Sequence, residues 1–267
     1  MKKILLASLA IVSVLLSSCS KKLEKGEFTV EKGKFSVGSE IGYPPFEYYD
    51  EDGTTPIGLD MDLAREVAKR LGLECTIIDT AWDGIFDGLK IDRYDAVMSA
   101  ATITPERLEN YDFTQSYIGN GQALIVRKDS TLDISSLEDV AGLQVGYQAE
   151  TTSDFYIKKH AAELGFEYVA CEYDKVLNAY DDLKFGRIDV VISDSLVAVS
   201  YLTAENSEFK QVWAGEPDEY FGICVKKGNT VLLEKLNAVL TDMKNDGSLS
   251  ELYMKVFGMD LSDSINE

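Results

Sequence analysis

The sequence Gly88-Leu89-Lys90-Ile91-Asp92-Arg93-Tyr94-Asp95-Ala96-Val97 returns in altered form as Leu183-Lys184-Phe185-Gly186-Arg187-Ile188-Asp189-Val190-Val191. In both places a helical pattern ends and a short apolar run, typical of a strand, begins. A supersecondary unit that occurs twice in one chain predicts two similar α/β lobes with a cleft between them.

The segments around both stretches continue the same alternation of strand and helix. Residues 59–72 predict a helix, because Leu63, Val67 and Leu71 share one face and Gly72 ends the pattern. Strands are expected at residues 35–38, 75–78, 94–98, 143–146, 168–172, 190–193 and 221–225. Further helices are expected at residues 85–89, 152–165, 176–186 and 230–245, with a last one ending at residue 257. This alternation indicates βαβ units around mostly parallel sheets.

Open α/β sheets bind ligands beyond the carboxyl ends of their strands. Applied to the expected strands, this rule selects residues 39–46, 79–84, 99–107, 148–153 and 193–195.

The side chains in these segments suit a zwitterion, that is, a free amino acid. Arg107 offers a planar pair of donors for a carboxylate, and Thr102 adds a hydroxyl. Thr152 opens a helix whose free amides and dipole also favour an anion. Asp194 supplies the charge for an ammonium, and Tyr43 and Trp82 could sandwich the ligand's side chain.

Each of these residues also has an ordinary structural explanation. Arg107 could form a surface ion pair with Glu106 or Glu109, and Asp194 could cap the helix that follows it. Trp82 could be a core residue, and Tyr43 could cover the first sheet. The binding interpretation depends on the joint pattern at predicted strand ends.

The chain resembles the family 3 extracellular solute-binding proteins, the polar amino-acid class that serves ABC importers. The resemblance covers roughly residues 34–259 and implies a two-lobed, periplasmic-binding-protein-like fold of type II with a hinged cleft. Its motifs are Thr102-x-Thr104-x-x-Arg107-x-x-x-x-Asp112-Phe113-Thr114, Tyr43-Pro44-Pro45-Phe46, Trp82-Asp83-Gly84-Ile85 and Phe257-Gly258-Met259-Asp260.

The resemblance also implies a role for each site residue. Arg107, Thr102 and the Thr152 amide would hold the carboxylate, and Asp194 with the backbone of Ala100 would hold the ammonium. Tyr43 and Trp82 would flank the side chain, which Glu40, Ser99 and Gln148 would select. Two positions depart from the common pattern: Ala100 replaces a frequent glycine or serine, and Glu150 stands in a loop that is often glycine-rich.

The same resemblance implies that the chain crosses twice between the lobes, near residues 119–122 and 216–222. Lobe 1 would then comprise residues 33–120 and 222–260, and lobe 2 residues 121–221.

The N-terminus predicts export and lipid anchoring. Lys2 and Lys3 precede an apolar run over residues 4–16 that is too short to span a bilayer, so residues 1–18 are expected to be a signal peptide. The ending Leu16-Ser17-Ser18-Cys19 resembles a bacterial lipobox, so Cys19 is expected to carry lipid at the outer face of the membrane. An incidental Cys19 after an ordinary signal peptide is the alternative. Residues 19–32 would form a polar tether.

Composition excludes several classes of function. The formal net charge of −20 becomes −22 without Lys2 and Lys3, which argues against nucleic acid and against a polybasic membrane patch. Cys75, Cys171 and Cys224 are odd in number and widely spaced, so neither a disulfide framework nor a zinc site is expected. We expect a monomer without cofactor or metal.

Specificity is expected to depend on Glu40. A carboxylate at the side-chain end of the pocket favours a cationic ligand, or a hydrogen-bond donor such as glutamine, histidine or cysteine. The expected ligand is therefore a polar or basic amino acid. Two rival functions are a ligand-sensing module and an enzyme resembling cyclohexadienyl or arogenate dehydratases, in which Glu40 or Glu150 would be the acid.

Overall fold

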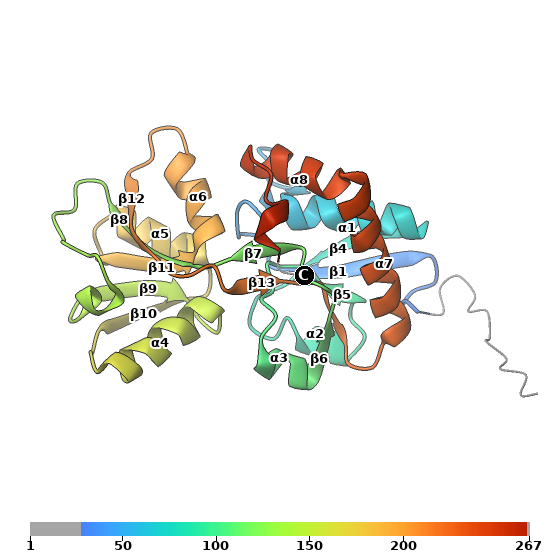
Figure 1. The fold of residues 1–267 in the computed structure, drawn as a ribbon, viewed down its shortest axis with the longest axis horizontal. Helices are drawn as coiled ribbons and strands as arrows, with labels where there is room; N and C mark the ends of the chain where they lie inside the picture. Colours follow the sequence, from blue (N-terminus) through green and yellow to red (C-terminus); the bar gives the residue numbers. More distant parts are fainter. Residues whose placement is uncertain (1–27, 266–267) are drawn as a thin grey trace, which may run out of the picture.

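The computed structural model describes residues 28–265, which form two α/β lobes side by side (Figure 1). The first lobe holds a five-stranded sheet in the order β4-β1-β5-β14-β6. Its strands are β1 (Lys34–Ser39), β4 (Glu74–Asp79), β5 (Ala96–Val97), β6 (Tyr111–Phe113) and β14 (Cys224–Lys226), and a small pair of strands is β2 (Tyr48–Tyr49) and β3 (Pro56–Ile57). Its helices are α1 (Leu59–Leu71), α2 (Asp87–Lys90), α3 (Pro105–Asn110), α7 (Thr230–Asp246) and α8 (Ser248–Phe257).

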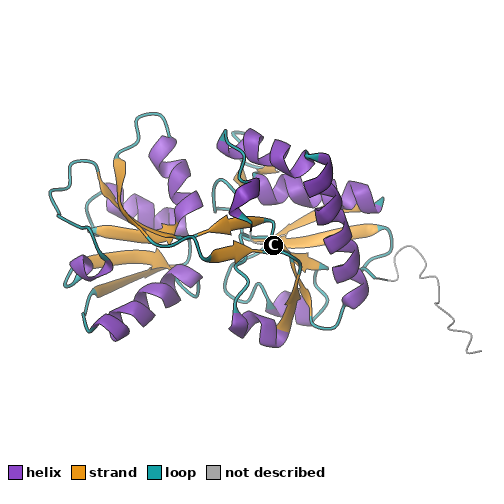
Figure 2. Ribbon diagram, in the orientation of Figure 1, coloured by secondary structure: helices purple, strands orange, loops and turns teal. Residues whose placement is uncertain are grey.

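The second lobe has a sheet of the same design, in the order β10-β9-β11-β8-β12. Its strands are β8 (Gln122–Arg127), β9 (Gln144–Gln148), β10 (Val169–Tyr173), β11 (Val190–Asp194) and β12 (Phe209–Ala214). Its helices are α4 (Thr152–Leu164), α5 (Val176–Lys184) and α6 (Ser195–Thr203), with the 3-10 turn η1 (Leu137–Val140). Figure 2 shows helices on both faces of each sheet.

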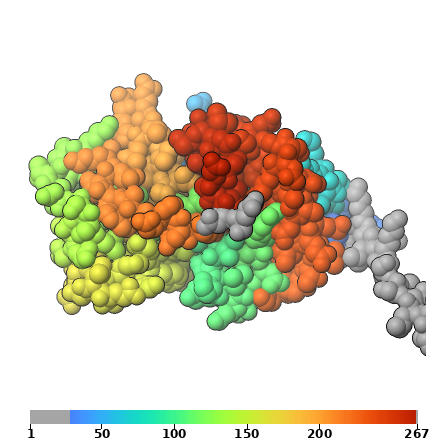
Figure 3. All heavy atoms as spheres, viewed as in Figure 1, coloured from blue at the N-terminus to red at the C-terminus, as the bar shows by residue number. Residues whose placement is uncertain are grey.

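Two antiparallel strands, β7 (Ile118–Asn120) and β13 (Glu219–Phe221), lie between the lobes and connect them (Figure 1). These crossings are the segments that the sequence predicts near residues 119–122 and 216–222. The final turn η2 (Ser262–Ser264) packs on β7, where the amide of Gly119 donates to Ser264 Oγ at 3.0 Å. In the space-filling view the lobes touch on this face, and the segment leading into β13 runs across their junction (Figure 3).

The sheets are mostly parallel, and one strand in each, β14 or β8, runs against the others. In each lobe three neighbouring strands are parallel, and the next two pair in antiparallel fashion. The antiparallel strands β14 and β8 are the ones that follow a crossing, so they enter their sheet from the side of the other lobe. The single strand expected at residues 221–225 is divided into β13 and β14 for the same reason, because β13 belongs to the crossing and β14 to the sheet.

Helix α1 illustrates how sequence patterning builds the core. Leu63, Val67 and their neighbours on one face are fully buried against β1 and β4. The helix ends at Gly72, whose φ of 66° is a left-handed conformation that glycine adopts without strain. Helices α7 and α8 pack on α1 and complete the same lobe.

The N-terminal end of the described chain differs from the expected tether. Phe28 is buried in the core of lobe 1, its carbonyl accepts from Asn229 Nδ2 at 3.3 Å, and the amide of Val30 donates to Asp95 at 2.5 Å. The sequence did not indicate this contact, because the segment is polar in composition and only one aromatic side chain, Phe28, is buried in the core. The predicted signal peptide and Cys19 lie outside the described residues. Within residues 28–265, no helix combines the length and apolar character that a membrane span requires.

Candidate functional site

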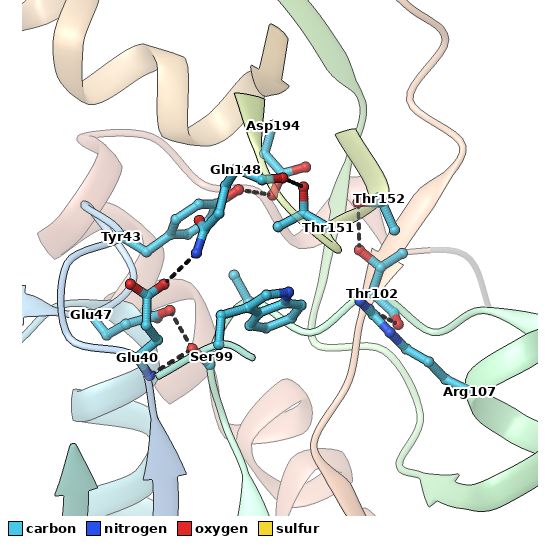
Figure 4. Close-up of a pocket in the computed structure, with 12 residues that line it drawn as sticks. Glu40, Tyr43, Glu47, Ser99, Thr102, Arg107, Gln148, Thr151, Thr152 and Asp194 are labelled. Carbon is cyan, nitrogen blue, oxygen red and sulfur yellow. Dashed lines mark hydrogen bonds between the residues drawn. The ribbon is translucent and has the colours of Figure 1, made fainter. Parts of the chain in front are cut away.

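A cavity lies between the lobes at the carboxyl ends of their parallel strands. All ten residues that the sequence predicts for the site line it, and so do Glu47 and Thr151, which the sequence reasoning did not select. The predicted set is Glu40, Tyr43, Trp82, Ser99, Ala100, Thr102, Arg107, Gln148, Thr152 and Asp194. Figure 4 shows Arg107, Thr102 and Thr152 at one end of the cavity and Glu40, Glu47 and Ser99 at the other.

The lobes touch across this cavity through hydrogen bonds. Tyr43 OH donates to Asp194 Oδ2 at 2.6 Å, and Gln148 Nε2 donates to Glu40 Oε2 at 2.9 Å. At the cavity's edge, Trp82 Nε1 donates to the carbonyl of Glu150 at 3.1 Å, and the Glu150 side chain is exposed. The structure is therefore a closed form of the two lobes.

Arg107 is fixed by its own helix and by aromatic rings. Thr104 caps α3 by accepting from the Arg107 amide at 3.2 Å, and Arg107 Nη1 donates to the carbonyl of Thr102 at 2.8 Å. The guanidinium carbon lies 5.2 Å from the Trp82 ring centre and 4.8 Å from that of Phe86. Burial lowers the pKa of Arg107 from its ordinary value, although guanidinium stays charged at any physiological pH.

No carboxylate in residues 28–265 lies within 4.0 Å of the Arg107 nitrogens, which leaves the surface ion pair with Glu106 or Glu109 unformed. A half-buried guanidinium without a carboxylate partner is costly, and an anionic ligand would offset that cost. The arrangement suits recognition of a carboxylate.

Asp194 is the principal anion that lobe 2 contributes. It stands at the start of α6, but its side chain makes no capping hydrogen bond and instead faces the cavity. Its Oδ1 accepts from Asn120 Nδ2 at 2.8 Å and from Gln122 Nε2 at 3.0 Å, while Oδ2 accepts from Tyr43. Burial, followed by the nearby charge of Glu219, raises the pKa of Asp194 to about 7.

Tyr43 therefore has a role that the sequence reasoning missed. The sequence predicts that the Tyr43 ring contacts the ligand's side chain. In the structure the Tyr43 hydroxyl also donates a hydrogen bond to Asp194 across the cleft. Burial raises the pKa of Tyr43 well above its ordinary value, so the hydroxyl stays a proton donor. One lone pair of Asp194 Oδ2 remains available for a further donor, such as an ammonium.

The N-terminus of α4 faces the same cavity. Thr151 is the cap residue: its side chain accepts from the Asp154 amide, and its hydroxyl donates to the carbonyl of Gln148 at 2.7 Å. Thr152 is the first helical residue, so its amide has no carbonyl partner within the helix. A thirteen-residue helix with a free amide at this end favours an anion near Arg107.

The opposite end of the cavity is acidic but already partly paired. Glu40 Oε1 lies 3.6 Å from Lys175 Nζ of lobe 2, and Lys175 also donates to the carbonyl of Ile41 at 3.0 Å. Burial raises the pKa of Glu40, while Gln148 and Lys175 oppose that shift. Lys175 is a further residue that the sequence reasoning missed, because its contact with Glu40 joins the two lobes.

Glu47 lies under the cavity beside Asp60. Its Oε1 accepts from Ser99 Oγ at 2.8 Å, and its pKa is raised well above its ordinary value by burial and then by Asp60. Asp60 accepts from the amide of Ala100 at 2.7 Å and from Tyr117 OH at 2.7 Å, and burial raises its pKa to about 6. Its bond to the amide holds Ala100 at a φ of 46°, a left-handed conformation that few non-glycine residues adopt.

The part of the chain that the structure describes offers no evident set of ligands for a metal ion. There, no three side chains of His, Cys, Asp or Glu come together in a way that could hold an ion. The thiols of Cys75, Cys171 and Cys224 are unpaired.

Comparison with known proteins identifies a family that this chain matches. Residues 35–259 match the family described as bacterial extracellular solute-binding proteins, family 3. An L-cystine-binding protein of Escherichia coli strain K12 is 31% identical over 232 residues, which cover 87% of this chain and 85% of that protein.

Solved structures agree with the sequence comparison. An ancestral arginine-binding protein bound to arginine is 39% identical, with a TM-score of 0.80 over 85% of this chain and 99% of that chain. An ancestral amino acid-binding protein, described as a precursor of cyclohexadienyl dehydratase, is 35% identical, with a TM-score of 0.75 over 84% of this chain and 95% of that chain. The chain therefore belongs to the bacterial extracellular solute-binding proteins of family 3.

Proposed function

We propose that this protein captures a free polar or basic L-amino acid outside the cytoplasm and delivers it to an ABC importer. The observation that carries the proposal is one pair of charges on opposite walls of one cavity. Arg107 of lobe 1 lacks a carboxylate partner among residues 28–265, and Asp194 of lobe 2 has an oxygen with a free lone pair. An amino acid carries the complementary carboxylate and ammonium. Four or five charge-assisted hydrogen bonds, each contributing about 1.5–3 kcal/mol, would support micromolar or tighter binding.

The charge of the surrounding residues supports a polar or basic side chain. Glu40, Glu47 and Asp194 line the cavity, whereas Arg107 is the only Lys or Arg among its lining residues. Lys175 compensates Glu40 from outside this lining. An acidic ligand side chain would meet net repulsion, and the rings of Tyr43 and Trp82 offer apolar contact and cation–π attraction. Relatives named for binding cystine and arginine agree with this class.

The remaining elements of the proposal concern location and assembly. A signal peptide over residues 1–18 and lipid on Cys19 would hold the mature protein at the outer face of the cell membrane. The protein would act as a monomer, and its partner would be the permease of an ABC transporter. Its site residues would bind the ligand without catalysis.

The alternative function is an enzyme of the cyclohexadienyl or arogenate dehydratase type. This alternative is considered because one solved relative is described as a precursor of such an enzyme. Turnover of prephenate or arogenate by the purified protein, lost in the variant Glu40→Gln, would favour the enzyme over the binding protein.

A thermal-shift panel tests the proposed function. A ligand that binds only the folded protein raises the melting temperature, and the rise grows with the logarithm of the ratio of its concentration to its Kd. We expect a rise with one or a few polar or basic amino acids and none with glutamate or aspartate. The proposal would be contradicted if prephenate alone raised the melting temperature, or if no amino acid in the panel raised it.

A further inference from the structure

Glu219 is an acidic side chain beside the place proposed for the ligand's carboxylate. It lies on β13, the second crossing between the lobes (Figure 1). Its Oε2 is 3.2 Å from Thr152 Oγ1 and 3.5 Å from Thr102 Oγ1, and the two hydroxyl oxygens are 3.4 Å apart. Thr102 comes from lobe 1 and Thr152 from lobe 2, so three separate parts of the chain meet at this point.

The two hydroxyl groups line the cavity on one side and face Glu219 on the other. Thr102 and Thr152 both line the central cavity, and Thr152 also lines a neighbouring apolar pocket that includes Glu219. A hydroxyl group has one proton to donate, and a carboxylate only accepts. A hydroxyl that donates to Glu219 therefore has no proton left for an anion in the cavity.

Glu219 is held in place independently of these hydroxyls. Gln122 Nε2 donates to its Oε1 at 2.9 Å, and Asn120 Nδ2 lies 3.5 Å from its Oε2. The same two amide groups donate to Asp194 Oδ1. Glu219 would thus keep its position when the hydroxyls turn away, and its charge would remain close to the ligand.

We propose that Glu219 competes with the ligand's α-carboxylate for the hydroxyl protons of Thr102 and Thr152. This inference rests on the proposed amino-acid site. The contacts of Glu219 with Thr102 and Thr152 join both lobes to the crossing and so favour the closed form. On binding, both hydroxyls rotate toward the ligand, and Glu219 retains only its two amide donors.

The test uses three variants of the full protein. Glu219→Gln removes the charge and keeps the shape, Glu219→Ala removes every side-chain contact, and Asp218→Asn removes an exposed charge one residue away. Melting temperatures establish that each variant is folded.

The first measurement concerns the protein without ligand and does not depend on the proposed function. Small-angle X-ray scattering should give a larger radius of gyration for Glu219→Ala than for the wild type, with Asp218→Asn unchanged. An identical radius of gyration for the wild type, Glu219→Ala and Asp218→Asn overturns the claim that Glu219 favours closure.

The second measurement is calorimetry at pH 8.5. L-arginine, L-glutamine, L-histidine and L-cystine are first compared on the wild type, and the one that binds most tightly is the first probe. The second probe is the same compound with its α-carboxylate converted to an amide. Glu219→Gln should lower the Kd of the acid about fivefold, the equivalent of about 1 kcal/mol, and change the Kd of the amide less than twofold.

An unchanged or higher Kd for the acid, or an equal gain for acid and amide, overturns the competition. Failure of the wild type to bind any of the four amino acids instead contradicts the proposed function, and the scattering measurement still decides whether Glu219 favours closure.

Discussion

The two lobes share a sheet order but bring different groups to the cavity: the only guanidinium among its lining residues comes from lobe 1, and Asp194 comes from lobe 2. In each sheet three parallel strands are followed by one antiparallel strand and by an edge strand that runs with the first three. The repeated sequence ends in Ser99-Ala100 beyond β5 of lobe 1 and in Ser193-Asp194 at the end of β11 of lobe 2. Ala100 brings only backbone to the cavity, whereas Asp194 brings a carboxylate. The arginine of the site, Arg107, comes from lobe 1 alone.

This difference explains why binding and closure are linked. Lobe 1 carries the guanidinium, the aromatic rings and, at the far end of the cavity, Glu40 and Glu47, and lobe 2 carries Asp194 and the N-terminus of α4. The two groups proposed for the carboxylate and the ammonium, Arg107 and Asp194, therefore come from different lobes. A ligand that contacts both lobes stabilises the closed form by its differential affinity for that form.

The largest effect is expected from removing the charge that lobe 1 contributes. Arg107→Ala should raise the Kd of every ligand at least about 100-fold, which corresponds to about 3 kcal/mol. Arg107→Lys keeps the charge without the two-pronged geometry and should raise the Kd about tenfold. Calorimetry measures both values. Binding by the alanine variant within a factor of three of the wild type would show that Arg107 is structural.

The next effect concerns the charge that lobe 2 contributes and depends on pH. Burial raises the pKa of Asp194 to about 7, and an ammonium binds its ionised form. Protonation below that pKa removes the ion pair, so the Kd should rise as pH falls from 8 to 5, by roughly 100-fold at pH 5. Asp194→Asn should bind weakly at every pH in this range. A Kd of the wild type that does not vary between pH 5 and 8 would contradict the role of Asp194.

A smaller effect is expected at the side-chain end, where the lobes meet through Glu40, Gln148 and Lys175. Glu40→Gln should change which ligand binds best, lowering the preference for arginine over glutamine about tenfold. Competition calorimetry measures this ratio. Glu150→Gln is the matched control, since the Glu150 side chain is exposed at the cleft. Equal changes in the two variants would mean that general acidity, rather than Glu40, sets the preference.

The smallest effect concerns stability beneath the cavity of lobe 1. The pKa values of Glu47 and Asp60 are raised in the folded protein, to about 6 for Asp60, so the stability that they contribute is complete below about pH 4 and is lost as pH rises through the folded-state pKa values. Glu47→Gln removes a buried negative charge beside Asp60 with little change of shape and should add about 1 kcal/mol at pH 8, or 2–4 °C in melting temperature. The exposed residue Glu163 gives the control variant Glu163→Gln. A lower melting temperature than the control at pH 8 would contradict this account.

The sequence predicted much of the site because strand ends are visible in it. Ser99, Gln148 and Asp194 each lie at or just beyond the end of a predicted apolar strand, and all ten selected residues line one cavity. Their roles in binding stay predictions. Within the segment 99–107, the donor chemistry of Arg107 and Thr102 selected them as partners for a carboxylate, and the family resemblance implied the same two residues.

Residues whose position depends on the meeting of the lobes escaped the sequence reasoning. Lys175 and Glu219 make their contacts with residues of the other lobe or of both lobes. Lys175 follows the parallel strand β10, a strand end that was not among the selected segments, and Glu219 lies on the crossing strand β13. Glu47 follows the predicted Tyr43-Pro44-Pro45-Phe46 loop, but nothing in its spacing indicates a buried carboxyl beside Asp60. Phe28 was missed because its neighbours on the N-terminal side are polar.

The most direct test of the central claim is calorimetry with the wild-type protein and the twenty amino acids, cystine, and the N-acetyl and carboxamide derivatives of the tightest ligand. If Arg107 and Asp194 bind the carboxylate and ammonium from opposite lobes, one or a few polar or basic amino acids will bind with micromolar or tighter Kd, and each derivative will bind at least about 100-fold more weakly. Tight binding of glutamate with none of arginine, or equal binding of the ligand and its N-acetyl derivative, would contradict the account.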